Sequence, residues 1–429
     1  MVYDFTSEGA PKGTNSVKWD MKPEGLSGKA EGKELLPMWV AEMDFPAAPF
    51  IVEALHRRID KGVFGYTLIP DSYYESVISW FSRRHGWDIG REQIIPISGI
   101  VPATSVAIRA LAFGAAASVS HRLSQDCSEN VAASAAPKVV MHTPAYNCFF
   151  SNIRNTGCQL SASKLLWDEA THTYQVDWED FERRCADPEA KVFLLCNPHN
   201  PTGRLWTREE LSRMGEICLR YGLPVISDEI HCEIVAPAGP RECHGKNEGY
   251  TPFASISTEF AHNSVSFVSP TKNFNIAGLQ IANIISANEE FRARMDRVIN
   301  DWEHCDVNQL GIVALEAAYS PEGEQWLAQM NDTVYGNFCL LRDALAAAFP
   351  QIRVPELQAT YLLWLDFSAL AQENAGALVS KHLLETEHLW INDGAMYGDP
   401  ACCRLNLACP HATMQEAVKR LLHGLHSLA

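Results

Sequence analysis

The middle of the chain alternates short apolar runs with segments of helical periodicity, and this alternation restricts the fold more than any other feature. Strands are expected at KVFLLC (191–196) and LPVISDE (223–229). Between them, residues 207–222 place apolar side chains at helical spacing behind a capping box formed by Thr207 and Glu210. Near-continuous apolar strands separated by helices are typical of a parallel or mixed sheet covered on both faces. The sequence therefore predicts an α/β protein.

The C-terminal third has a different pattern. A long amphipathic helix is expected over residues 322–349, with short strands at 361–367 and 402–409. A final helix is predicted to begin at a capping box of Thr413 and Glu416. This arrangement favours a second, smaller α+β domain.

Composition excludes several classes of protein. Lys and Arg number 35 against 52 Asp and Glu, so the net charge is 35 − 52 = −17, which argues against nucleic acid or an anionic membrane as a partner. The first 20 residues lack the apolar core of a signal peptide, and no apolar run is long enough to cross a membrane. The 13 cysteines include no Cys-x-x-Cys pair and indicate free thiols in a reducing compartment. We expect a cytoplasmic protein.

Residues 115–137 form an Ala- and Ser-rich stretch that is poor in large apolar side chains. Such a composition buries little surface, so a peripheral, mobile excursion between a helix and the strand KVVMHT is expected.

Polar side chains follow several of the expected strands. The positions in question are Asn197 and Asn200 after KVFLLC, Asp228, Glu229 and His231 after LPVIS, and Thr271 and Lys272 after SVSFVS (264–269). A further strand, EQIIPIS (92–98), runs into the glycine turn and helix GIVPATSVAIRAL, whose first N–H groups suit a phosphate. Ligands of open α/β sheets bind beyond the carboxyl ends of the strands. We therefore expect these groups to share one rim.

Each of these signals alone has an ordinary structural explanation. The glycine turn is common between a strand and a helix, and His231 is equally well a buried core histidine or part of a helix cap. No second pair of ligands at metal spacing accompanies His231, so a metal site is not expected. Lys272 is more unusual, because it is the only lysine after Asp228 that lies at the end of an expected strand.

A lysine, an aspartate and a phosphate cradle together suggest pyridoxal 5′-phosphate. Its aldehyde needs an amine for a Schiff base, its ring nitrogen needs an acidic partner, and its phosphate needs N–H and hydroxyl donors.

The ordered motifs make the chain similar to a known family. They are SGIVPA, TPAYN, NPHNPTG, SDEIH, SPTKNFNIAGLQ and CCRLNLACP. Together they resemble the fold-type I pyridoxal-phosphate enzymes of the class I/II aminotransferase superfamily. GTNSVKWD (13–20), LPMWVAEMDFPAAP (36–49), FGYT (64–67) and INDGAMYG (391–398) resemble its MalY/PatB-type cystathionine β-lyases (cysteine-S-conjugate β-lyases). The likeness extends over essentially the whole chain.

The resemblance implies a large pyridoxal-phosphate-binding domain with a mostly parallel seven-stranded sheet, followed by a smaller α+β domain. The expected boundaries are an N-terminal segment at 1–48 that packs with the small domain, the large domain at 49–304, and the small domain at 305–429.

The resemblance also implies roles for individual residues. Lys272 forms the Schiff base and moves the Cα proton, while Asp228 pairs with the ring nitrogen. Tyr146 stacks on the ring, Asn200 donates to the ring hydroxyl oxygen and contacts the substrate, and His231 lies nearby. The two Asn-Pro pairs would hold Asn200 rigidly beside the cofactor.

The remaining implied contacts concern phosphate and substrate. The phosphate is held by the backbone of Ile100 and Val101 with the Ser269 and Thr271 hydroxyls. Tyr66 reaches the phosphate and substrate from the other subunit of a homodimer, and acts in catalysis. Arg404 binds the substrate α-carboxylate through two hydrogen bonds, which a lysine cannot reproduce.

The implied activity is α,β-elimination of an S-substituted L-cysteine, such as cystathionine, to a thiol, pyruvate and ammonia. An aminotransferase with the same cofactor residues remains an alternative. A third hypothesis, a binding protein that has lost catalysis, conflicts with the intact Lys272, Asp228 and Arg404. The sequence departs from the family in the long 115–137 stretch and in a short approach to Arg404 at MYGDPACCRLN.

Overall fold

The computed structural model has a central sheet of seven strands in the order β2-β10-β9-β8-β7-β3-β4. It describes residues 2–7, 9, 11–23, 34–114, 136–237, 249–304, 306–371 and 373–428. The strands are β2 (Ile94–Ile97), β3 (Lys138–Thr143), β4 (Gln159–Lys164), β7 (Ala190–Cys196), β8 (Val225–Asp228), β9 (Ser264–Val268) and β10 (Ala282–Ile285). The strand β10 pairs antiparallel with both β2 and β9, and the other neighbouring strands of this sheet pair in parallel. The predicted mostly parallel, seven-stranded sheet is confirmed.

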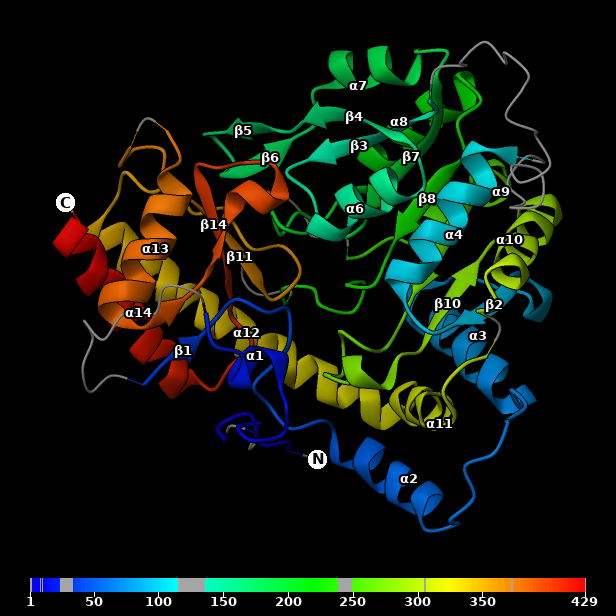
Figure 1. Cartoon of the computed structure of the whole chain (residues 1–429), viewed down its shortest axis with the longest axis horizontal. Coiled ribbons are helices and arrows are strands. Elements are labelled where there is room, and N and C mark those ends of the chain that lie inside the picture. The colour runs from blue at the N-terminus through cyan, green and yellow to red at the C-terminus, as the bar shows by residue number, and fades with distance from the viewer. Residues whose placement is uncertain are drawn as a thin grey trace, which may run out of the picture.

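Helices cover both faces of this sheet (Figure 1). They are α4 (Ile100–Ala112), α6 (Asn147–Asn155), α7 (Trp178–Cys185), α8 (Arg208–Arg220), α9 (Thr258–His262) and α10 (Glu289–Asp301). Alternate strand residues enter different cores. In β3, Val139 and Met141 pack with α4 and α10, whereas Val140 packs with residues of α7 and α8. Successive side chains of a strand point to opposite faces, so a sheet covered twice requires the continuous apolar runs seen in the sequence.

Helix boundaries follow local capping chemistry. Thr207 caps α8, and its hydroxyl and the Glu210 carboxylate form the predicted capping box. The final helix, α14 (His411–Leu428), begins two residues before Thr413, so the capping box predicted there is wrong. The N–H of Met414 donates to the carbonyl of Pro410 at 3.0 Å, which closes the first turn on the proline instead.

A smaller α+β unit lies beside the central sheet (Figure 1). It has a three-stranded antiparallel sheet in the order β11-β14-β13. Its elements are α12 (Pro321–Ala348), β11 (Leu362–Asp366), α13 (Ala375–Glu387), β12 (Leu389–Trp390), β13 (Asn392–Asp393), β14 (Cys402–Asn406) and α14. These elements agree with the helix and strands expected in the C-terminal third.

The N-terminal part of the chain packs against both units. The strand β1 (Leu36–Pro37) pairs in parallel with β12, and α11 (Gln309–Ala318) packs against α2 (Pro49–Ile59) and α3 (Asp71–His85). The remaining short elements are α1 (Val17–Asp20), η2 (Arg91–Gln93), β5 (Leu166–Asp168), β6 (Thr173–Gln175), η4 (Phe253–Ser255), η5 (Ala277–Leu279) and η6 (Gly394–Tyr397). The domain boundaries at 48/49 and 304/305 stay a prediction.

Two predictions concern features outside this architecture. Of the 115–137 stretch, residues 115–135 lie outside the described residues. None of the helices in the described part of the chain is both long enough and apolar enough to span a bilayer.

Candidate active site

The carboxyl ends of β7, β8 and β9 meet at one edge of the sheet. Cys196 pairs in register with Asp228, and Asp228 pairs with Phe267. The N–H of Asn197 donates to the Asp228 carbonyl at 2.8 Å, which joins the ends of two strands. The polar residues predicted after these strands therefore start from a common rim, which we call the carboxyl-end rim.

Asp228 is a buried acid at the centre of this rim. Burial raises the pKa of its carboxyl to about 7, and the neighbouring Glu229 adds to the rise. The Ile230 N–H, which donates to Oδ1 at 3.1 Å, and the charge of Lys272 offset part of it. A carboxyl in this setting gains from a cationic ligand, because an opposite charge favours its ionised form.

Lys272 lies a few residues beyond β9 and is partly buried. Its Nζ donates to the carbonyl of Ala41 at 2.6 Å. Burial, helped by the positive charge of Arg404, lowers the pKa of the amine to about 8. An amine with this pKa is partly neutral near neutral pH, and the neutral form is the nucleophile and the base.

Arg404 projects from β14 of the smaller unit and is buried. Its Nη1 donates to Asn200 Oδ1 at 3.3 Å, its Nη2 donates to the Trp39 carbonyl at 3.2 Å, and its guanidinium lies 4.5 Å from the ring centroid of Tyr397. Within the described residues its Nε has no hydrogen-bond partner. Its described partners are neutral oxygens, so the guanidinium keeps the capacity to bind an incoming carboxylate.

Asn200, His231 and Tyr146 surround these charged groups. Both Asn-Pro peptide bonds of NPHNP are cis, and Asn200 is buried. Burial lowers the pKa of His231 to about 3, which keeps its imidazole neutral, and its Nδ1 has no partner among the residues described. Tyr146 immediately precedes α6, and burial raises the pKa of its phenol, on which the charges of Arg404 and Asp228 also act.

The predicted phosphate groups lie at the start of α4 and after β9. Gly99 precedes α4, so the N–H groups of Ile100 and Val101 belong to its first turn, where a helix attracts anions. The Ser269 and Thr271 hydroxyl oxygens lie 2.7 Å apart. Ser269 Oγ also donates to the Ile281 carbonyl at 2.7 Å, so this hydroxyl already has an acceptor within the chain.

Tyr66 is the one predicted site residue that the single chain leaves apart. It lies in the loop between α2 and α3 and is fully exposed, at 101%. The loop forms the lower edge of the molecule in Figure 1.

Sequence reasoning missed groups that complete the site. The Ala41 carbonyl also accepts from the Tyr361 hydroxyl at 3.1 Å, and the Tyr361 ring lies 5.8 Å from that of His231. Tyr397 supports the Arg404 guanidinium. The segments 36–49 and 391–398, which contain Ala41 and Tyr397, were noted as motifs. The role of the Ala41 carbonyl could not be predicted, because every residue has a backbone carbonyl. Tyr361 belongs to no motif in the sequence.

These groups fit pyridoxal phosphate. The buried Asp228 suits a ring nitrogen, the Lys272 amine suits an aldehyde, and the α4 N-terminus suits a phosphate. The unpartnered nitrogens of Arg404 and His231 are orphans that a bound ligand would satisfy. No set of three or more side chains able to hold a metal ion occurs in the described ranges.

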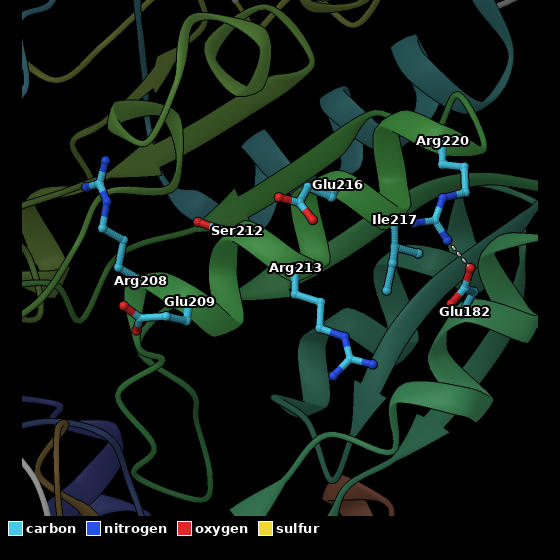
Figure 2. A pocket seen from close by; sticks show the side chains of 8 residues that line it. All are labelled: Glu182, Arg208, Glu209, Ser212, Arg213, Glu216, Ile217 and Arg220. Carbon is cyan, nitrogen blue, oxygen red and sulfur yellow. Dashed lines mark hydrogen bonds and ion pairs between the residues drawn. The ribbon is translucent and has the colours of Figure 1, made fainter.

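A second group of charges lies on the outer face of α8, where a pocket opens to solvent (Figure 2). One of its arginines pairs with an acid and another packs against an aromatic ring. Arg220 forms an ion pair with Glu182, and the Arg213 guanidinium lies 4.2 Å from the Trp178 ring centroid. The described residues that line this pocket include none of the predicted site residues.

Comparison with known proteins identifies the family of this chain. The family model for aminotransferase class I and II matches residues 34–421. Cystathionine beta-lyase PatB of Bacillus subtilis is 35% identical over 96% of this chain and 97% of its own length, and protein MalY of Escherichia coli is 30% identical over 100% of both. The solved structure of cystalysin from Treponema denticola, which contains a pyridoxal 5′-phosphate cofactor, covers 100% of both chains at 30% identity with a TM-score of 0.86. The chain therefore belongs to the class I and II aminotransferase family, as a fold-type I pyridoxal-phosphate protein similar over its full length to PatB and MalY.

Proposed function

We propose that this protein is a pyridoxal-phosphate-dependent carbon–sulfur β-lyase. Its substrate is an S-substituted L-cysteine, either cystathionine or another cysteine S-conjugate, and its products are a thiol, pyruvate and ammonia. Relatives and solved neighbours over nearly the full length include proteins named cystathionine beta-lyase and C-S lyase, which supports this reaction.

One observation carries the proposal. The segment around Trp39 and Ala41 contacts both the amine of Lys272 and the guanidinium of Arg404. This segment belongs to the stretch 36–49, whose sequence resembles the β-lyase branch rather than the wider superfamily. One of the motifs that resemble lyases thus contacts the proposed reacting groups directly.

The cofactor, when bound, supplies an aldehyde that condenses with amines and a ring that accepts electron density. This chain supplies the groups that bind and move protons. Lys272 takes the proton from the substrate Cα, Asp228 pairs with the ring nitrogen, and Arg404 binds the α-carboxylate. Asn200 and Tyr146 orient the ring, His231 lies beside them as a neutral imidazole, and Ile100, Val101, Ser269 and Thr271 bind the phosphate.

The overall reaction balances with one water molecule. The Cα–H and Cβ–S bonds of the thioether break, the sulfur leaves with a proton as the thiol, and water converts the remaining three-carbon fragment to pyruvate and ammonia. A thiol leaving group at Cβ distinguishes this outcome from amino transfer, which leaves the Cβ–S bond intact.

We also propose a homodimer in which Tyr66 of each subunit completes the site of the other. The loop that carries it exposes Val63 at 63%, Phe64 at 63% and Leu68 at 91%, in addition to Tyr66. Neighbouring apolar side chains with such exposure are typical of an interface. A Tyr66→Phe variant should raise KM or lower kcat without changing the elution volume in size-exclusion chromatography; unchanged kinetics would contradict the role.

A cytoplasmic location is part of the same proposal. Cysteines outside any disulfide include Cys185, Cys196, Cys218 and Cys232, all of them buried. Buried reduced thiols favour a reducing compartment.

The test is to incubate the cofactor-loaded protein with cystathionine and with several S-alkyl and S-aryl cysteines. Pyruvate, free thiol and amino transfer to an added keto acid are measured together. We expect thiol and pyruvate in equal amounts. Amino transfer without thiol release would show an aminotransferase, the alternative activity within this family.

A further inference from the structure

Residues 39–45, which we call the crossing segment, run between the two units and carry hydrogen bonds from both. The Trp39 carbonyl accepts from Arg404 Nη2 at 3.2 Å, and the Ala41 carbonyl accepts from Lys272 Nζ at 2.6 Å. Arg404 belongs to β14 of the smaller unit, and Lys272 follows β9 of the central sheet. The position of this backbone therefore sets where two proposed reacting groups lie.

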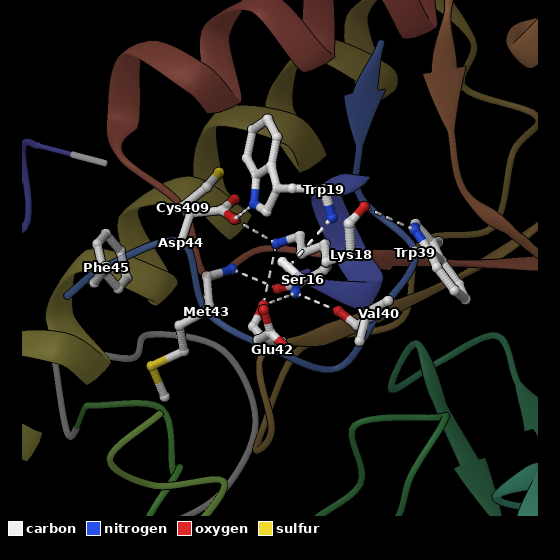
Figure 3. Close-up of polar contacts among 12 residues, drawn as sticks. Ser16, Lys18, Trp19, Trp39, Val40, Glu42, Met43, Asp44, Phe45 and Cys409 are labelled. Atoms are coloured by element: carbon white, nitrogen blue, oxygen red, sulfur yellow. Dashed lines mark hydrogen bonds and ion pairs between the residues drawn. The ribbon is translucent and has the colours of Figure 1, made fainter. Parts of the chain in front are cut away.

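Lys18 binds the crossing segment directly, at Glu42 and Asp44 (Figure 3). Its side chain is fully buried, its Nζ lies 2.7 Å from Asp44 Oδ1, and it donates to the Glu42 carbonyl at 3.1 Å. The same Asp44 oxygen accepts from Trp19 Nε1 at 2.9 Å. A buried amine with a buried carboxylate requires such close pairing, because either charge alone is costly in the interior.

The two sets of contacts are separated by very little chain. Lys18 binds Glu42 and Asp44, which lie one and three residues after Ala41. The Ala41 carbonyl is the acceptor for Lys272 Nζ. The Glu42 N–H donates to the Val40 carbonyl at 2.9 Å, which closes a tight turn around Ala41, so a shift at Glu42 or Asp44 is transmitted to the Ala41 carbonyl.

Other contacts hold the crossing segment as well. Asn406 Nδ2 donates to the Val40 and Glu42 carbonyls at 2.6 and 2.5 Å, and Asn275 Nδ2 donates to the Met43 carbonyl at 3.1 Å. Loss of the Lys18 anchor should therefore displace the segment without releasing it.

We propose that Lys18, through its ion pair with Asp44, is a positioning residue that holds the crossing segment where its carbonyls orient Lys272 and Arg404. Lys18 itself touches neither reacting group in the described contacts. The charges that shift the pKa of Lys272 are those of Arg404, Glu42, Cys148 and Asp228, so we assign to Lys18 a geometric effect. The role of Lys272 and Arg404 in catalysis rests on the proposed function.

The test compares variants of this pair with a matched lysine elsewhere. Lys18→Met removes the ammonium, and Asp44→Asn removes the charge while keeping an oxygen for Trp19. Lys138→Met is the control, since Lys138 forms ion pairs with Asp187 and Glu189 at 2.9 and 2.6 Å and starts β3 at the end of the sheet opposite the carboxyl-end rim. Far-UV circular dichroism and thermal unfolding establish that each variant is folded.

Two readouts follow in the folded variants. The first is the rate at which the cofactor-free protein captures added pyridoxal phosphate, followed by absorbance, because capture requires an oriented Lys272 amine. The second is KM for the thioether substrate, which reports on Arg404. We expect Lys18→Met and Asp44→Asn to slow capture and raise KM by roughly tenfold each, because small misplacements of reacting groups have effects of this size or larger. The control should change both by less than about twofold.

Capture and KM at wild-type values in folded Lys18→Met or Asp44→Asn would overturn the proposal, as would equal losses in the Lys138→Met control. If neither variant of the pair folds while the control does, the pair is an element of folding and the proposal also fails. If the unaltered protein captures cofactor but releases no thiol, the proposed function fails, and the capture rates still decide the role of Lys18.

Discussion

The carboxyl-end rim and the outer face of α8 both contain charged side chains, but those at the rim are buried or partly buried and those on α8 are in contact with solvent. At the rim, Asp228 and Lys272 are withdrawn from water, which raises the pKa of the acid to about 7 and lowers that of the amine to about 8. On α8, Arg220 pairs with Glu182 in contact with solvent. The two regions are close along the chain, since α8 connects β7 to β8.

This difference teaches which charges are available for chemistry. Charges that pair with each other in water are screened and already satisfied, so a ligand gains little from them. The rim groups are desolvated, and the guanidinium Nε of Arg404 and Nδ1 of His231 lack partners in the described residues. Desolvated groups with unused bonding capacity interact strongly with a ligand of matching charge.

The largest effect that would sharpen this comparison is expected from Lys272→Ala. Removing the amine takes away both the attachment point for the cofactor and the proposed base, so thiol release should fall roughly 1,000-fold or more. The measurement is initial-rate thiol release by the cofactor-loaded protein. If the variant kept a tenth of the activity, an amine other than that of Lys272 would be the reacting one.

A smaller effect, on stability, is expected from Asp228→Asn in the cofactor-free protein. The folded-state pKa of about 7 lies above the usual 3.8, so the carboxyl contributes stability that is complete below about pH 4 and is lost as pH rises through about 7. The loss should be on the order of 2–4 kcal/mol. Between pH 5 and 8, the unfolding temperature should decline less with rising pH in Asp228→Asn than in the unaltered protein. The same decline in both proteins would contradict the raised pKa of Asp228.

The next effect concerns substrate binding through Arg404. In Arg404→Lys one of two charged hydrogen bonds to the α-carboxylate is lost, each worth about 1.5–3 kcal/mol, so KM should rise roughly 10- to 100-fold. Steady-state kinetics at several thioether concentrations provide the measurement. An unchanged KM would mean that a different group binds the carboxylate.

The smallest effect is expected on α8. Arg220→Gln breaks the ion pair with Glu182 at the surface and should cost less than about 1 kcal/mol in the free energy of unfolding, with kcat and KM within about twofold of the original. Urea unfolding and the thiol-release assay test this together. A large kinetic loss would break the distinction between the two regions.

Much of the fold could be predicted from the sequence because its signals are local. The apolar run at 191–196 and the Thr207–Glu210 capping box set a strand and a helix start by short-range chemistry alone. The start of α14 could not be predicted in the same way, because Pro410 and Thr413 both offer plausible first turns and only the completed packing selects between them.

The candidate site divides along the same line. Asp228 ends a strand and Asn200 and Lys272 follow strands, so the rule for parallel sheets brings them to one rim. Trp39 and Ala41 contribute backbone carbonyls, which every residue has, and their contacts to Arg404 and Lys272 span more than 200 positions of sequence. No periodicity or motif spacing encodes such a contact, and only the folded chain displays it.

The central claim is that the amine of Lys272 holds pyridoxal phosphate on this rim. Borohydride reduction of the cofactor-loaded protein, followed by digestion and peptide mass mapping, fixes the cofactor to whichever amine carries it. The account predicts one pyridoxyl-phosphate group on the peptide that contains Lys272 and none on the Lys272→Ala protein. The same group found on another lysine of the unaltered protein would contradict the account.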